Sequence, residues 1–110
     1  MKSFYALDEV LRERAASKRS YLEFLRVPTM SCGVYVLPAG SVDHQRPHVQ
    51  AEVYFVISGE ARMTVHDDDG EQDRALSPGD LILVKGKQPH RFHDITKELV
   101  VLVVFAPPEG

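Results

Sequence analysis

The feature that most constrains this chain is a series of short apolar segments, each ended by residues that favour turns. The segments recur at intervals of about ten residues and are rich in Val, Tyr, Phe and Ile, which favour strands. We expect strands over Tyr21–Val27, Ser31–Leu37, Glu52–Ser58, Ala61–His66, Glu71–Leu76, Leu81–Val84, Gln88–His93 and Glu98–Phe105. Because no helical pattern separates them, we do not expect a parallel sheet with crossover helices, and the sequence predicts an all-β sandwich or barrel.

The turns and the last apolar run add detail to this expectation. Asp69-Gly70 is a strong hairpin signal, and Pro78-Gly79 predicts a second tight turn. The last segment contains six consecutive apolar residues, Leu99 to Val104. Such a run indicates a strand that is buried on both faces or lies at a contact between subunits.

The first 20 residues follow a different pattern. Leu7, Val10 and Leu11 recur at helical spacing with acidic residues between them, which predicts a short amphipathic helix over Ala6–Ser17. We therefore expect residues 1–20 to form a helical arm that acts as a lid or an oligomer contact. Residues 21–110 are expected to form the β-barrel domain.

Length and composition exclude several classes of protein. A chain of 110 residues is expected to form one domain with its own core. Its net charge of −3 speaks against sequence-independent nucleic-acid binding, which needs an excess of Lys and Arg. The single cysteine, Cys32, rules out an internal disulfide framework. The sequence has neither a membrane-spanning apolar stretch nor a signal-peptide pattern, so we expect a cytoplasmic domain with no nucleic-acid or membrane partner.

Four of the five histidines form two pairs, which are the strongest candidates for chemistry. On a continuous strand His48 and Glu52 would share one face, but they would lie about 13 Å apart at roughly 3.3 Å per residue. A bend is needed for both to bind one ion, and Pro47 disfavours a regular strand there. His90 and His93 differ in parity, so only one of them should face the interior.

Two histidines and one carboxylate from distant parts of an all-β chain are the ingredients of an open metal site. His48, Glu52 and His90 form such a set. It suits Fe(II), and Mn, Ni or Zn also accept nitrogen and oxygen ligands of this kind. The cofactor we expect is therefore a divalent metal ion, whose identity the spacing does not select.

These residues fall on the two motifs of the cupin family, which the sequence resembles over about residues 31–105. The first motif is matched by Gly40, His48, Glu52 and Gly59. The second is matched by Gly79 and His90, with Asp94 at the position of the family's Asn, and 19 residues separate the motifs. The resemblance implies a small antiparallel jelly-roll barrel that forms a homodimer, with a metal ion held by His48, Glu52 and His90.

Besides Asp94, the sequence departs from the family pattern at three positions. Lys85 and Lys87 replace the Pro and Gly of the second motif, and Arg46 replaces the first His of the first motif. Three alternatives follow for that missing ligand. His44 lies two residues earlier on the same face, and Gln45 offers an amide oxygen. In the third alternative the site has three ligands, and Arg46 binds an anionic substrate through paired hydrogen bonds.

The remaining candidates have simpler interpretations. His93 is expected to fix the orientation of a neighbouring ligand. His66 and the acidic turn Asp67–Asp69 are expected to be solvated, because a calcium loop would need a later Glu ligand that is missing. The resemblance implies a metal-dependent enzyme for a small molecule, most commonly a dioxygenase, and otherwise an isomerase or lyase. The alternative is a non-catalytic small-ligand-binding or sensor module on the same barrel.

Overall fold

The computed structural model describes residues 2–108 and contains one helix followed by six strands. These elements are α1 (Leu7–Ser17), β1 (Tyr21–Val27), β2 (Met30–Leu37), β3 (Ala51–Asp67), β4 (Gly70–Leu76), β5 (Leu81–Val84) and β6 (His90–Ala106). Helix α1 packs on β1 and β2, and Val10 is its buried residue. Among the described residues, no helix is long and apolar enough to cross a membrane.

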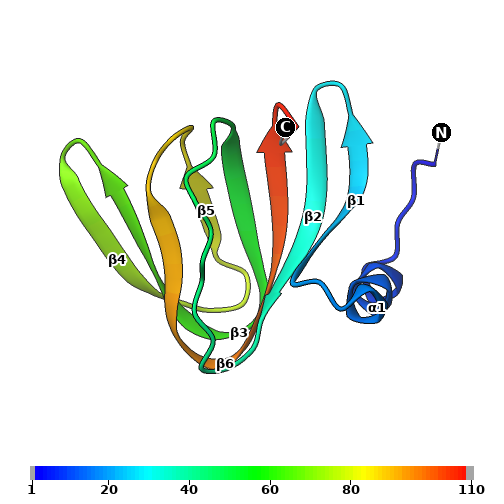
Figure 1. Ribbon diagram of the computed structural model, residues 1–110, viewed down its shortest axis with the longest axis horizontal. Helices are drawn as coiled ribbons and strands as arrows, with labels where there is room; N and C mark the ends of the chain where they lie inside the picture. The colour runs from blue at the N-terminus through cyan, green and yellow to red at the C-terminus, as the bar shows by residue number, and fades with distance from the viewer. Residues whose placement is uncertain (1, 109–110) are drawn as a thin grey trace.

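The strands form one antiparallel sheet that bends into two halves. Its order is β1-β2-β6-β3-β4, and β5 pairs with the first part of β3. Strands β3 and β6 run through both halves, because the first part of each pairs with the last part of the other. Figure 1 shows the two halves diverging from the bends of β3 and β6, which lie at the bottom of the view.

The bends fall where the sequence predicted breaks between separate strands. Gly59 has a φ of 108° and Asp94 a φ of 49°, and the β3–β6 register shifts between Val56 and Arg62. The pairing partner continues past each bend, so two pairs of predicted strands become two 17-residue strands. The residues that face the core change parity at the bend, as a bulge requires.

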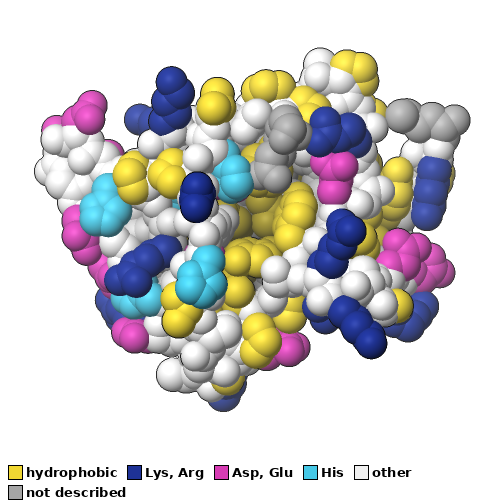
Figure 2. All heavy atoms as spheres, viewed as in Figure 1, with side chains coloured by type: hydrophobic (Ala, Val, Ile, Leu, Met, Phe, Trp, Pro, Cys, Tyr) yellow, Lys and Arg dark blue, Asp and Glu magenta, His cyan; other side chains and the backbone are white. Residues whose placement is uncertain are grey.

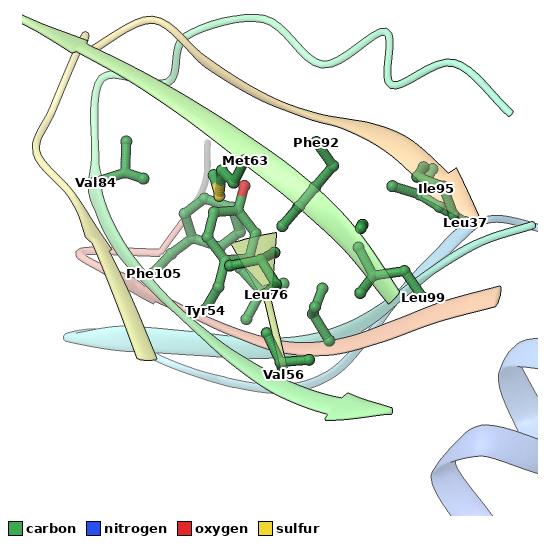
Figure 3. Packing of buried hydrophobic residues seen from close by; sticks show 13 residues of the cluster. Leu37, Tyr54, Val56, Met63, Leu76, Val84, Phe92, Ile95, Leu99 and Phe105 are labelled. Atoms are coloured by element: carbon green, nitrogen blue, oxygen red, sulfur yellow. The ribbon is translucent and has the colours of Figure 1, made fainter. Parts of the chain in front are cut away.

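The core fills the space between the two halves. Figure 3 shows Leu37, Ile95 and Leu99 at one end of it, and Val84, Met63, Tyr54 and Phe105 at the other. Strand β6 lies between β2 and β3, and within the Leu99–Val104 run only Leu102 and Val104 are not fully buried. The single chain therefore buries most of this apolar run without a contact between subunits.

Residues 38–50 connect β2 to β3 without forming a strand, yet they run alongside the first half of β6. The amide of Gly40 donates to the carbonyl of Ile95, and the amide of Lys87 donates to the carbonyl of His48. Between these contacts, the amide of Phe92 donates to the Asp43 carboxylate at 2.9 Å. The segment therefore runs antiparallel to β6, and this course brings it over the opening between the two halves.

Candidate functional site

The centre of the site is a contact between two buried residues from opposite halves of the sheet. Glu52 of β3 pairs with Phe105 in one half, and His90 of β6 pairs with Val65 in the other. Oε1 of Glu52 nevertheless lies 2.8 Å from Nε2 of His90, and both side chains are inaccessible to solvent. The contact exists because β3 bends between Glu52 and Val65.

The hydrogen bonds around His90 fix the state of its ring. Nδ1 lies 2.8 Å from the carbonyl of Gln88, so in the neutral ring this nitrogen carries the hydrogen and Nε2 presents a lone pair. Burial opposes a charge on His90, but its contacts with Glu52 and Gln88 and the charges of Glu52 and Asp43 raise its pKa. The environment of Nε2 therefore favours a positive charge.

Three electron-rich atoms lie close together here, namely Oε1 of Glu52, Nε2 of His90 and the hydroxyl oxygen of Tyr54. The hydroxyl of Tyr54 donates to Oε1 of Gln45 at 2.8 Å, and its oxygen lies 3.2 Å from Nε2 of His90. Both carboxylate oxygens of Glu52 are buried, and when the His90 ring is neutral they accept no hydrogen bond from the described residues. Burial and the charge of Glu52 raise the pKa of Tyr54, so its phenol stays protonated. A carboxylate in this position requires a shared proton or a bound cation.

A divalent metal ion fits this donor chemistry. Glu52 supplies a charged oxygen and His90 an oriented nitrogen, and the ring of His48 is centred 6.2 Å from that of His90. The required bend between His48 and Glu52 is present at residues 49–50. Among residues 2–108, however, no three His, Cys, Asp or Glu side chains already have ligand spacing. His48 must approach the pair for all three to bind one ion.

The structure distinguishes between the candidates for the missing ligand. The half-buried Gln45 donates from Nε2 to Asp43 at 2.8 Å, which points its Oε1 toward Tyr54. His44 and Arg46 lie on either side of Gln45 in the chain and are exposed. Of the three alternatives, only Gln45 is placed at the centre of the site.

Other predicted residues lie away from this centre. His93 is on the opposite side of β6 from His90, with Nε2 2.9 Å from Thr64 Oγ1 and 2.7 Å from Asp73 Oδ2. Its Nδ1 lies 3.4 Å from Asp94. His93 therefore contacts neighbouring strands on the outer face and does not contact the Glu52–His90 pair. Exposed side chains are found at His66, Lys85 and Lys87.

A cavity of about 200 Å³ adjoins the site. It is lined by Tyr21, Tyr35, Gln45, His48, Tyr54, Val103 and Phe105. Figure 2 shows a hollow near the middle of this face, with hydrophobic side chains inside it and histidines to one side. The volume is below the range for drug-sized ligands, so the cavity suits a small molecule.

Sequence reasoning missed Asp43, which organises the wall of this cavity. The carboxylate is buried and accepts hydrogen bonds from the Tyr35 hydroxyl, the Gln45 amide and the Gln45 side chain, as well as from the amide of Phe92. The local signal was an Asx turn, in which an Asp side chain binds the backbone two residues later. The contacts with Tyr35 and Phe92 are long-range and left no mark in the local pattern.

Comparison with known proteins identifies similar sequences. Residues 33–105 match the family model described as Cupin domain. An uncharacterized protein of Streptomyces coelicolor is 49% identical over 110 residues, which is 100% of both chains.

Solved structures share the fold. The DMSP lyase DddQ of Ruegeria pomeroyi matches with a TM-score of 0.65 and 26% identity, over 73% of this chain and 39% of that protein. An oxalate decarboxylase of Bacillus subtilis matches with a TM-score of 0.67 and 25% identity, over 73% of this chain and 22% of the decarboxylase. KdgF from Halomonas has a TM-score of 0.68 at 18% identity, covering 79% and 76% of the two chains. These likenesses confirm the predicted small antiparallel jelly-roll barrel.

Proposed function

Because this chain belongs to the cupin family, we propose that it binds a divalent metal ion through His48, Glu52 and His90 and acts on a small molecule in the adjoining cavity. The observation that supports this proposal best is the buried Glu52 carboxylate, which lies 2.8 Å from the oriented Nε2 of His90 and accepts no hydrogen bond when that ring is neutral. A cation held by these two groups would balance the buried charge in place of a proton on His90.

Each protein group has a distinct role in this proposal. Glu52 supplies negative charge, and the carbonyl of Gln88 holds the ring of His90 in one orientation. Gln45 offers its amide oxygen as a further ligand, while His44 would have to turn inward to serve instead. A bound Fe, Mn, Ni or Zn ion would supply Lewis-acid or redox chemistry.

Metal analysis of the untagged full-length protein tests the site. We expect near-stoichiometric metal in the wild type and a loss of about tenfold or more in metal affinity in His48→Ala, Glu52→Gln and His90→Ala. His66→Ala is the matched control, because this exposed histidine lies on the β3–β4 hairpin, outside the site. A wild-type protein that stays metal-free after incubation with Fe, Mn, Ni and Zn would overturn the proposal.

For the reaction, we propose dioxygenase chemistry, with isomerase and lyase reactions as the next candidates on the same site. The DMSP lyase and the oxalate decarboxylase are enzymes by name, which supports an enzyme, although this chain spans less than half of either. Oxygen uptake by the metal-loaded protein with a panel of carboxylates, sugars and diketones measures the first reaction. Product analysis of the same samples measures the other two.

A non-catalytic binding module is the second candidate. The replacement of the family's first motif His by Arg46, whose side chain is exposed, favours it because the site then has fewer ligands. Saturable ligand binding by metal-loaded protein, without conversion of any compound in the panel, would support this function over an enzyme.

We also propose that the chain forms a homodimer. Val53 and Phe55 of β3 face outward beside Leu83 and Leu81 of β5, their partners in the ladder. All four side chains are exposed, with Leu81 at 69% and Leu83 at 60%. An apolar group of this kind on the outer face of a sheet marks a protein contact, and a second copy would bury it.

A further inference from the structure

Seven aromatic side chains contact one another in a closed ring, which we call the aromatic belt, and all but His90 and Phe92 line the cavity. In order around the ring, its members are Tyr35, Tyr21, Phe105, His48, His90, Tyr54 and Phe92. Neighbouring ring centroids are 5.0–6.5 Å apart, and the ring closes with Phe92 and Tyr35 at 6.5 Å. The cavity is therefore enclosed by π-systems more than by aliphatic side chains.

The charges behind the wall of the cavity are carboxylates. Glu52, which faces His90, and Asp43 are buried near the belt, and none of the described residues that line the cavity is a Lys or Arg. Asp43 does not line the cavity itself but accepts hydrogen bonds from Tyr35 and Gln45 of its wall, and the exposed Arg46 is not part of the lining. The surroundings favour a positively charged ligand group.

The two sides of the belt differ in chemistry. The imidazoles of His48 and His90 form one side, next to Glu52, and Tyr21 and Tyr35 lie across the ring from them. The hydroxyl of Tyr35 donates to the Asp43 carboxylate at 3.1 Å, which makes the phenol ring richer in electrons. An organic cation would be attracted to the tyrosine side, away from a metal ion on the imidazole side.

We propose that the cavity binds a small onium cation, a quaternary ammonium or sulfonium group, against Tyr21, Tyr35 and Phe105. This inference names the ligand class of the cavity and so rests on the proposed function. The size is suitable, because an apolar cavity of roughly 150 Å³ holds benzene, and this cavity measures about 200 Å³. A trimethylammonium group also has no N–H donors that would need partners in an aromatic wall.

Calorimetric titration with two ligands of the same shape tests the proposal. Choline carries the cation, and 3,3-dimethylbutan-1-ol replaces its nitrogen by carbon and is neutral. We expect choline to bind about tenfold more tightly to the full chain, both metal-free and metal-loaded, because only the cation gains from the aromatic faces. Equal affinities, or tighter binding of the neutral alcohol, would overturn the inference.

Variants locate the cation within the cavity. Tyr21→Leu should remove most of the preference for choline over the alcohol, and Tyr35→Phe, which keeps the ring but loses the Asp43 contact, should reduce it. Tyr5→Leu is the matched control, because Tyr5 packs on Phe24 outside the cavity, with centroids 5.4 Å apart. Thermal melts establish whether each variant is folded. If Tyr21→Leu does not fold, the preference of Tyr35→Phe for choline over the alcohol tests the site. An unchanged preference in the folded variants counts against this site.

The results also separate this inference from the proposed function. A preference for choline in protein that never retains metal would overturn the metal proposal alone. Retained metal without a preference for choline would overturn the onium inference alone.

Discussion

Nε2 of His90 and Oε1 of Glu52 are 2.8 Å apart, although His90 pairs with Val65, which lies 13 residues after Glu52 along β3. A straight strand would place those two positions roughly 40 Å apart. The site thus depends on the bend at Gly59, where the backbone of β6 leaves no room for a side chain on β3.

Replacing Gly59 by Ala should destabilise the fold and open the site. A Cβ there would lie 2.2 Å from the Glu98 carbonyl oxygen and 2.7 Å from Cα of Leu99, at a φ of 108°. We expect a loss on the order of 3 kcal/mol in the free energy of unfolding, measured by urea denaturation. Gly79→Ala is the control, because its φ is 95° but no atom lies within 4 Å of the added carbon. An equal loss in both variants would show that crowding at the bend is unimportant.

Replacing Asp43 by Ala should loosen the segment of residues 38–50. The change leaves the buried amide of Phe92 and the hydroxyl of Tyr35 without their acceptor. We expect a loss of about 3 kcal/mol in the free energy of unfolding, together with faster hydrogen exchange at Gln45 and Phe92. Asp68→Ala, at an exposed carboxylate on the β3–β4 hairpin, should have little effect on either measurement. Unchanged exchange at Phe92 would contradict this anchoring role.

The outer face of the sheet should give stability a dependence on acid pH. The hydrogen bond from Thr64, supported by Arg62 and His93, lowers the pKa of Asp73 from 3.8 to about 2. Because the folded-state pKa is the lower one, this stabilisation is present above pH 4 and is lost as the pH falls toward 2. The difference in unfolding free energy between wild type and Asp73→Asn should therefore shrink as the pH falls from 4 to 2. Asp68→Asn, on the exposed hairpin, should show no such trend.

The apolar group on β3 and β5 should control self-association. Leu81→Glu combined with Leu83→Lys places opposite charges on the outer face while leaving Ile82 and Val84 in place. We expect the wild type to be a dimer by light scattering over a range of concentrations and the double variant to be a monomer with unchanged circular dichroism. A wild-type protein that is monomeric throughout the range would remove the proposed interface.

Much of the fold followed from local patterns. The alternation of apolar and polar residues and the turn signals placed β1, β2, β4 and β5 within one residue of their observed ends. The long strands were divided wrongly, because Gly59 and the polar residues near Asp94 have the same local signature as a turn. Only the pairing partner across the sheet shows that the strand continues.

The candidate site was less accessible to such reasoning. His48, Glu52 and His90 were predicted as ligands from motif spacing, and the difference in parity between His90 and His93 agrees with their opposite faces. Local patterns leave Gln45, His44 and Arg46 as alternatives, because the inward placement of Gln45 depends on hydrogen bonds with Asp43 and Tyr54. Contacts between residues far apart in sequence carry that information.

Strands β3 and β6, which run through both halves of the sheet, also constrain how this chain can change during evolution. Side chains on a strand alternate between its faces, so one extra residue between Glu52 and Gly59 would turn Glu52 toward solvent. A substitution alters one contact, whereas an insertion there would remove the carboxylate from the site altogether. Length is therefore more tightly fixed than composition along this part of β3, and insertions should accumulate instead in the hairpin at residues 67–70.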